Sequence, residues 1–357
     1  MSIARALALR GVRDIVVVER NNLGLEASFA AGGMLAPQAE ADSRDNFFDL
    51  LCASRDLYPN FASDLKDETG IDIELDTTGT LYLAFTEHDQ REIDERFEWQ
   101  TSAGLQVEKL TATEARMLEP CVAPNVSGAL RFGSDIQVEN RKLVSALANS
   151  LAQLEVRIVC GVNVESIQQA QHWVTGVHTS AGYISCSTIV VAAGAWTSFV
   201  ASLKVDPVRG QMICLTATPQ LTRHVIYSPR GYLIPRQDGR LLAGSTSERA
   251  GFVKEVTAGG ITTILRNALE ISPAVGNLAL ADSWSGLRPR ASDGLPVLGP
   301  CGEIDGLIFA TGHYRNGILL APITGELIAQ AIEENAAPTA LAPFSPNRFV
   351  HEMSNMP

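Results

Sequence analysis

The first 19 residues constrain the fold more than any other part of the sequence. Residues 2–10, SIARALALR, are strong helix formers with apolar residues at helical spacing, and Gly11 follows at the position of a left-handed helix cap. Residues 14–19, DIVVVE, form a β-branched run that is typical of a parallel strand buried on both faces. A helix followed by such a strand is the second half of a βαβ unit. The sequence therefore predicts an α/β fold with a doubly wound, Rossmann-like domain of three layers.

Glu19 ends this predicted strand and has two interpretations. In a dinucleotide-binding unit, an acid at the end of the second strand accepts hydrogen bonds from a ribose, about 20 residues after the glycine loop. Counting back from Glu19, we expect the first strand and its glycine loop to lie upstream of Met1. The alternative is that Glu19 is only a polar residue at a strand end.

Two segments of small residues indicate places where the backbone approaches a ligand. Residues 23–37 contain Gly32 and Gly33 and then run on into a hydrophobic MLAP. Glycine allows such a close approach because it has no side chain. Residues 187–196, STIVVAAGAW, place Ala-Ala-Gly directly after a buried strand. The alternative for residues 23–37 is an ordinary mobile turn, and the alternative for residues 187–196 is a tight contact between a helix and a strand.

The order of the segments predicts two domains that are interleaved along the chain. Near its end, residues 307–311 predict a buried strand, and residues 318–333 predict a helix bent at Pro322. The expected ranges are 1–40, 138–205 and 284–345 for the doubly wound domain, 41–137 and 206–283 for a mixed α/β substrate domain, and 346–357 for a C-terminal tail.

Charge and composition exclude several classes of function. The chain has 28 Lys and Arg against 40 Asp and Glu, a net charge of −12, and no basic stripe for nucleic acid or an anionic membrane. Its six cysteines form no CxxC pair and its six histidines have no metal-ligand spacing. We therefore expect no metal site and a reducing, cytoplasmic location. No apolar run approaches the roughly 20 residues of a membrane-spanning helix.

Four longer motifs resemble the D-amino-acid oxidase family of FAD-dependent oxidoreductases. They are AAGGMLAPQAE, TIVVAAGAWTS, WSGLRPRASDGLPVLG and IFATGHYRNGILLAPITGELIA, and the resemblance extends from Ser2 to about Ile332. It is greatest to the glycine-oxidising members that serve thiamine synthesis. The resemblance implies noncovalent FAD, a small amino-acid substrate, oxygen as the electron acceptor and a homo-oligomer. The implied reaction converts glycine, and small amines such as sarcosine, to the imine and glyoxylate with release of hydrogen peroxide.

The same resemblance implies roles for individual residues. Arg288 clamps the substrate carboxylate through a planar, bidentate guanidinium. Tyr232 adds a phenolic hydrogen bond, and Arg315 lies near the flavin and the mouth of the active site. The implied FAD contacts are Glu19 at the ribose, Ser28, Gly33, Met34 and Leu35 at the pyrophosphate and flavin, Val164 at the adenine, Ala193 and Gly194 along the cofactor, and His313, Arg315, Asn316, Gly317, Ile318 and Leu319 around the isoalloxazine, with His313 setting the loop rather than acting as a base.

Other interpretations stay open at this stage. Arg288 would instead pair with a structural acid, Tyr232 would bind any buried partner, and Arg315 would only hold its loop. Rival activities are a broader D-amino-acid or sarcosine oxidase and a D-amino-acid dehydrogenase that passes electrons to a quinone. A further rival is a remnant that binds no flavin and has no activity.

Overall fold

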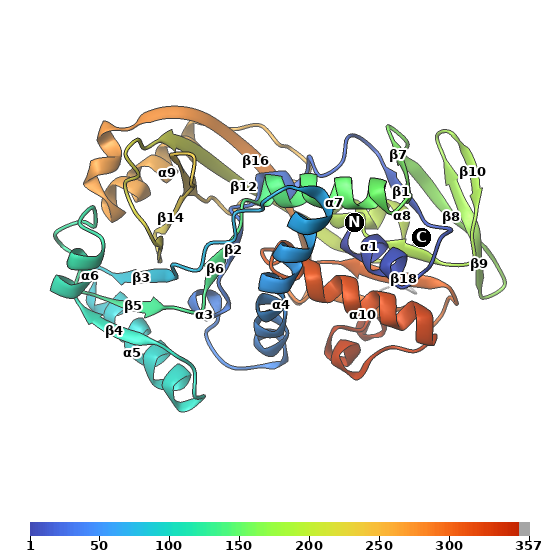
Figure 1. Ribbon diagram of the computed structural model, residues 1–357, viewed down its shortest axis with the longest axis horizontal. Helices are drawn as coiled ribbons and strands as arrows, with labels where there is room; N and C mark the ends of the chain where they lie inside the picture. Colours follow the sequence, from blue (N-terminus) through green and yellow to red (C-terminus); the bar gives the residue numbers. More distant parts are fainter. Residues whose placement is uncertain (350–357) are drawn as a thin grey trace.

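The computed structural model describes residues 1–349, which form an elongated molecule with two lobes (Figure 1). One lobe, on the left of Figure 1, is built on an eight-stranded sheet, and the other contains the N-terminus with α1, α7 and α10. Of the predicted C-terminal tail, Pro346–Phe349 form a 3₁₀ helix with Phe349 buried, and residues 350–357 lie outside the described residues.

Helices and strands are mixed along the chain. The helices are α1 (Ser2–Leu9), α2 (Ala27–Ala30), α3 (Pro37–Glu40), α4 (Asn46–Thr69), α5 (Glu87–Ser102), α6 (Ala112–Leu118), α7 (Asn140–Gln153), α8 (Thr197–Val200), α9 (Ala258–Ile271) and α10 (Ala321–Glu334). The strands are β1 (Val16–Glu19), β2 (Met34–Leu35), β3 (Thr80–Ala84), β4 (Glu108–Thr111), β5 (Gly128–Phe132), β6 (Ile136–Gln137), β7 (Arg157–Cys160), β8 (Val164–Ala170), β9 (Trp173–Thr179), β10 (Gly182–Ser185), β11 (Ile189–Val191), β12 (Val205–Thr216), β13 (Val225–Ser228), β14 (Gly231–Pro235), β15 (Arg240–Gly244), β16 (Ala279–Ala291), β17 (Val297–Pro300) and β18 (Leu307–Thr311). Over residues 1–349, no helix is long and apolar enough to cross a membrane.

The helix and strand predicted at the start of the sequence are both present. α1 packs between α10 and α7, with Leu7 clustered with Ala329 and Ala4 with Leu151. β1 pairs in parallel with β7, as expected for a strand of a doubly wound domain. The prediction that this strand is buried on both faces is wrong, because all four of its residues are partly exposed. Within the described part of the chain, β1 is hydrogen-bonded along one edge only, to β7.

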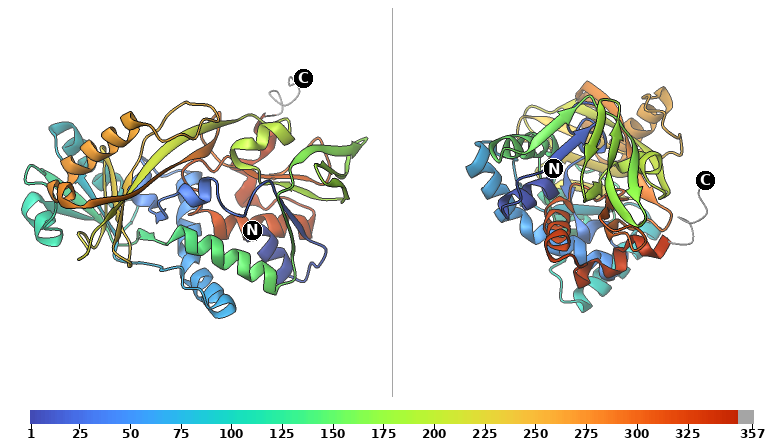
Figure 2. Two further views of the ribbon diagram at one scale, coloured as in Figure 1. Left: turned by 90° about the horizontal axis from the view of Figure 1, so that it is seen from above. Right: turned by 90° about the vertical axis from the view of Figure 1, so that its right-hand side faces the viewer.

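A second parallel pair lies in the same lobe. β11 pairs in parallel with β18, which is completely buried as predicted, and β17 adds an antiparallel strand. β8, β9 and β10 form an antiparallel meander at the end of the molecule remote from α6 and α9 (Figures 1 and 2). The prediction of a helix bent at Pro322 is wrong. α10 begins at Ala321 and Pro322 lies in its first turn, where the missing N–H of proline breaks no hydrogen bond.

The large sheet has the strand order β16-β12-β15-β14-β13-β3-β5-β4. β12 and β16 form its longest pair, and β16 continues without a break through the predicted domain boundary at 283/284. One face packs against α9, with Ile264 and Ala268 clustered with Ile213. The opposite face, which we call the site face, packs against Phe29 and Ala30 of the segment between β1 and β2.

Candidate active site

Three tyrosines form a row across the site face of the large sheet. Tyr227 of β13 lies directly opposite Tyr82 of β3 and Tyr232 of β14. Side chains at opposite positions of neighbouring strands project to the same face and contact each other. The ring centroids of Tyr82 and Tyr227 lie 5.4 Å apart and those of Tyr227 and Tyr232 lie 6.0 Å apart, in stacked arrangements. The row is therefore a rigid aromatic wall.

Beyond Tyr232 the row continues through a glycine and a methionine. Gly244 of β15 lies opposite Tyr232, and Met212 of β12 lies opposite Gly244. A Cβ atom at Gly244 would lie 2.2 Å from Met212 Sδ and 3.0 Å from Tyr232 Cε2, so a side chain does not fit between them. The Tyr232 hydroxyl donates a hydrogen bond to Met212 Sδ over 3.2 Å. Because a thioether is a weak acceptor, this hydroxyl can exchange the sulfur for a stronger partner.

Arg288 of β16 lies half-buried on the same face, with its guanidinium over Gly210 of β12. A Cβ atom at Gly210 would lie 2.2–2.4 Å from the guanidinium atoms of Arg288. Arg288 Nη1 donates to the Thr246 carbonyl over 3.0 Å, and Nη2 donates to Ser245 Oγ over 2.7 Å. Both partners are neutral. Among residues 1–349, no carboxylate forms an ion pair with Arg288, so a structural acid is not its partner there.

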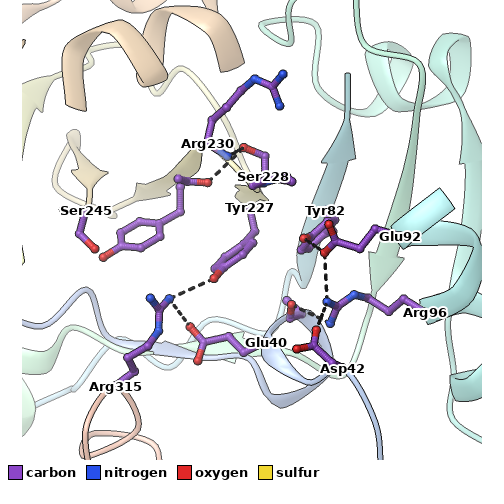
Figure 3. A pocket seen from close by; sticks show the side chains of 14 residues that line it. Glu40, Asp42, Tyr82, Glu92, Arg96, Tyr227, Ser228, Arg230, Ser245 and Arg315 are labelled. Carbon is purple, nitrogen blue, oxygen red and sulfur yellow. Dashed lines mark hydrogen bonds and ion pairs between the residues drawn. The ribbon is translucent and has the colours of Figure 1, made fainter. Parts of the chain in front are cut away.

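A cavity of about 300 Å³ opens beside the tyrosine row (Figure 3). Tyr227 and Tyr232 line it from the sheet, and Arg315 reaches it from the loop after β18. Ser245, whose hydroxyl accepts from Arg288, lines the cavity as well. The structure thus places Tyr232 and Arg315 at one cavity and Arg288 directly behind one of its lining residues.

Arg315 is held at the cavity by two groups (Figure 3). Its Nη2 donates to Glu40 Oε1 over 2.9 Å and to the Tyr227 hydroxyl over 3.0 Å. The Glu40 charge raises the pKa of Arg315, and burial raises the pKa of Tyr227. Arg315 therefore keeps its charge, and Tyr227 keeps its proton, at physiological pH.

α3 is a single helical turn that brings Glu40 to the cavity, and it is fastened at both ends. The Asp135 carboxylate accepts from the backbone N–H groups of Gln38 and Ala39 over 3.1 and 2.9 Å. Arg96 donates to the carbonyls of the same two residues over 3.3 and 3.1 Å. A carboxylate at the N-terminus of a helix and a cation at its C-terminus both match the helix dipole. The position of Glu40 is therefore fixed by Asp135 at one end of α3 and at the other by Arg96, which itself lines the cavity.

Three of the residues expected at FAD follow the ends of parallel strands. Glu19 ends β1, and its carboxylate accepts from the Asn21 N–H over 2.9 Å. Ala193 and Gly194 lie just beyond the end of β11, after Ala192. Gly194 has φ +54°, and a Cβ atom there would meet nothing within 4 Å, so open space adjoins this turn. Val164 begins β8, and neither it nor Glu19 lines the cavity beside the tyrosines.

The other expected cofactor residues lie in two connecting segments. Ser28 is in α2, and its carbonyl accepts from Asn140 Nδ2 over 2.7 Å, while Met34 and Leu35 form β2. Gly33 has φ +71°, which favours glycine. The second segment, between β18 and α10, contains His313 followed by Arg315, Asn316, Gly317, Ile318 and Leu319.

His313 is neutral at physiological pH. Its ring lies within hydrogen-bond distance of Thr324 in α10, with Nε2 3.2 Å from Oγ1. Burial lowers the pKa of His313 to about 4. The side chain therefore adds no positive charge to the loop, and its contact joins the loop to the following helix. No three His, Cys, Asp or Glu side chains in residues 1–349 are placed to hold a metal ion.

Several residues at the cavity were missed by sequence reasoning. Glu40 and Tyr227 both bind Arg315, and Tyr82 completes the aromatic row. Glu40 is part of the motif AAGGMLAPQAE, so its position beside the expected cofactor segment was a usable signal. Tyr82 and Tyr227 gave no comparable signal, because only the pairing of β3 with β13 places them together.

Parallel strands that end in Glu19 and in a small-residue turn, joined to a mixed sheet with a charged cavity, define a dinucleotide-dependent enzyme of the α/β class. The family model named DAO, FAD dependent oxidoreductase, matches residues 1–331. The chain belongs to this family, which confirms the family resemblance of its motifs and the prediction of an FAD-dependent enzyme.

Individual relatives agree with this assignment. The chain is 35% identical to a glycine oxidase of Geobacillus kaustophilus over 343 aligned residues. The aligned region covers 94% of this chain and 91% of the relative. It is 38% identical over 355 residues to the bifunctional protein ThiO/ThiG of Synechocystis sp., covering 98% of this chain but 52% of the relative, so it spans about half the length of that protein. The crystal structure of glycine oxidase from Geobacillus kaustophilus superimposes with a TM-score of 0.92 at 34% identity, covering 96% of this chain and 94% of that chain. This match confirms the predicted fold class.

The buried Asp135 carboxylate makes a prediction about pH. Burial raises the pKa of Asp135 to about 7, above the value in an unfolded chain. Between about pH 4 and pH 7 the folded state holds a proton that the unfolded state releases, so the stabilisation from this proton is lost as the pH rises toward 7, by about 1.4 kcal/mol per pH unit at most. The free energy of unfolding of Asp135→Asn should lack this decline.

Denaturant unfolding of both proteins at pH 5, 6, 7 and 8 measures the difference. We expect the free energy of unfolding of the wild type, minus that of Asp135→Asn, to fall from pH 5 to 7 and to level off above pH 7. Asp64→Asn, on the exposed surface of α4, is the matched control and should follow wild type throughout. Parallel pH profiles for wild type and Asp135→Asn would contradict the assignment.

Proposed function

We propose that this chain is a glycine oxidase. The reaction is glycine plus oxygen and water to glyoxylate, ammonia and hydrogen peroxide, through the imine. Sarcosine would be a second substrate, and the imine would supply thiazole formation in thiamine synthesis. The proposal draws on relatives named glycine oxidase and ThiO/ThiG and extends to a homo-oligomer in the cytoplasm.

The observation that carries this proposal is the environment of Arg288. Its half-buried guanidinium has only neutral partners among the described residues, and it adjoins a cavity of about 300 Å³. A partly desolvated cation without a counter-charge attracts an anion, and a planar guanidinium matches the two oxygens of a carboxylate. We assign Arg288 to the substrate carboxylate, with the Tyr232 hydroxyl turning from Met212 Sδ to the same group.

FAD fits the residues around the turns that follow the parallel strands. The space beside Gly194, the left-handed turn at Gly33 and the carboxylate of Glu19 suit a long, flat dinucleotide. We assign Glu19 to its ribose, and we assign Ser28, Gly33–Leu35, Val164, Ala193–Gly194, His313 and Arg315–Leu319 to the remaining contacts. When bound, FAD supplies the acceptor for the hydride that leaves the substrate α-carbon. We also propose the domain ranges that were predicted from the sequence.

The protein's part in the reaction is to bind and orient the substrate. Arg288 fixes the carboxylate, while the packed wall of Tyr227 and Tyr232 limits the space beyond the α-carbon. The charge of Arg315 is compensated by its ion pair with Glu40, so Arg315 does not compete with Arg288 for the carboxylate of glycine. We assign no base role to His313, because burial lowers its pKa to about 4 and its ring contacts Thr324 of α10, so the substrate amine would lose its proton to solvent before oxidation.

Arg288→Lys tests the substrate clamp. A lysine ammonium keeps the charge but cannot form two parallel hydrogen bonds, so kcat/KM for glycine should fall by about 10- to 100-fold. Bound flavin, measured by its visible absorbance, should be unchanged. Arg266→Lys, on the exposed surface of α9, is the control. Wild-type kcat/KM in Arg288→Lys would remove Arg288 from the substrate site, and loss of flavin would reassign it to the cofactor.

Gly210→Ala tests the position of the same guanidinium. The added Cβ atom would lie 2.2–2.4 Å from the flexible end of Arg288, so the guanidinium must move while the backbone stays in place. A displacement of this size in a binding group should lower kcat/KM by about 10- to 100-fold with little change in the melting temperature. At Gly259 an added Cβ meets nothing within 4 Å, so Gly259→Ala is the matched control. Equal kcat/KM values for Gly210→Ala and Gly259→Ala would show that the position of the Arg288 guanidinium does not affect the reaction.

Substrate size provides the third test. The tyrosines of the wall stack on one another and yield little, so steric exclusion of large side chains should exceed the about 1–3 kcal/mol typical of one unfilled methylene. We expect peroxide release with glycine and sarcosine, less with D-alanine, and hardly any with D-phenylalanine at equal concentration. Preference for D-phenylalanine would favour the broad D-amino-acid oxidase. Reduction of an artificial dye without peroxide would favour the dehydrogenase.

A further inference from the structure

Arg236 is buried at the meeting point of three segments that are far apart in the sequence. It follows β14, and its side chain is 3% exposed. Nη2 donates to the Gly32 carbonyl over 2.7 Å, and Nη1 donates to the Val138 carbonyl over 2.8 Å. The Glu139 carboxylate lies 3.7 Å from Nε and offsets the buried charge. One side chain therefore joins the large sheet to the segment before β2 and to the start of α7.

Arg236 also orients the side chain of Asn140, which makes a second set of hydrogen bonds to the same segment. Arg236 Nη2 donates to Asn140 Oδ1 over 3.2 Å. On its other side, Asn140 Nδ2 donates to the carbonyls of Ser28 and Phe29 over 2.7 and 3.2 Å. An amide carries its acceptor on one side and its donors on the other. Because Arg236 holds the oxygen, the nitrogen must face residues 28 and 29.

The backbone at Gly33 has no room to change its path. Its φ is +71°, and a Cβ atom there would lie 2.1 Å from the Val138 carbonyl oxygen and 3.0 Å from Arg236 Nη2. The Val138 N–H in turn donates to the Gly33 carbonyl over 2.9 Å. Gly33 is thus pressed against the residues that Arg236 connects.

We propose that Arg236 is a positioning residue for the cofactor, which sets the shape of residues 28–35 without contacting the substrate. The inference rests on the proposed assignment of Ser28 and Gly33–Leu35 to FAD. Without the guanidinium, the carbonyls of Gly32 and Val138 lose their buried donors and the Asn140 amide is free to rotate. Residues 28–35 then sample other conformations, and FAD binds only to the fraction with the correct one.

The test measures FAD affinity and backbone protection in the full chain, independently of activity. Arg236→Met keeps an unbranched side chain, shorter than that of arginine, and removes every donor. We expect its Kd for FAD, from the change in flavin fluorescence, to rise about ten-fold or more, and amide hydrogen exchange in residues 28–35 of the FAD-free protein to accelerate. Arg236→Lys retains a charge and fewer donors, so it should recover part of both losses. Exchange in β12 and β16 should not change.

The matched control is Arg240→Met. Arg240 pairs with the same Glu139 carboxylate and is held by Asp238, but it makes no hydrogen bond to residues 28–35. Its FAD affinity should stay within about two-fold of wild type, so an equal loss in this control would attribute the effect to the Glu139 charge and overturn the proposal.

Two further outcomes are decisive. Asn140→Asp removes the donors to Ser28 and Phe29 while keeping the shape of the side chain, and it should weaken FAD binding even where Arg236→Met does not fold. Wild-type affinity and exchange in Asn140→Asp and Arg236→Lys would refute the inference alone. If the wild-type chain itself shows no FAD binding, the proposed function fails together with it.

Discussion

The register between β12 and β16 is the constraint on which the site depends. It places Met212 opposite Trp284 and Gly210 opposite Gly286, which sets the Arg288 side chain on the site face. A slip of one residue would turn this whole set of side chains to the other face. The glycines are part of the same constraint, because a Cβ atom at Gly286 would lie 2.4 Å from Ala30 Cβ and one at Gly210 would displace Arg288. The Arg288 guanidinium and the segment that contains Ala30 can therefore lie on this face of the sheet only because Gly210 and Gly286 have no side chains.

Charge around the cavity is compensated in pairs, with one exception. Buried or half-buried ions are costly unless a counter-charge and hydrogen bonds satisfy them. Within the described residues, Arg288 has neutral partners only, which is the environment that the proposed carboxylate clamp requires. The compensated pairs are Arg96 with Asp42 and Glu92, Arg230 with Asp89 and Glu270, and Arg315 with Glu40.

Local patterns were sufficient for the elements whose structure is local, such as α1, whose helical spacing and following glycine are visible in residues 2–11. Motif resemblance supplied Tyr232 and Arg315, which line one cavity, and Arg288, which lies behind its lining residue Ser245. The Glu40–Arg315 pair joins residues 275 positions apart, and neither side chain alone indicates the other. The burial of β1 and the start of α10 were misjudged because burial depends on the number of neighbouring strands, and the effect of a proline depends on its place in the helix.

The path of residues 28–41 between the two lobes shows how irregular backbone is held in a buried place. Helix α3 and strand β2 are too short to satisfy their own carbonyl groups, and each buried carbonyl left unpaired would cost about 1–3 kcal/mol. Two buried arginines supply the donors, Arg236 at Gly32 and Arg96 at Gln38 and Ala39. A guanidinium has five N–H groups in one plane, so it can serve several carbonyls from different segments at once. The acids beside these arginines offset their charge. The segment before β2, which is expected at the flavin, and the turn after β2, which carries Glu40, are therefore both held by a buried guanidinium that donates to backbone carbonyls.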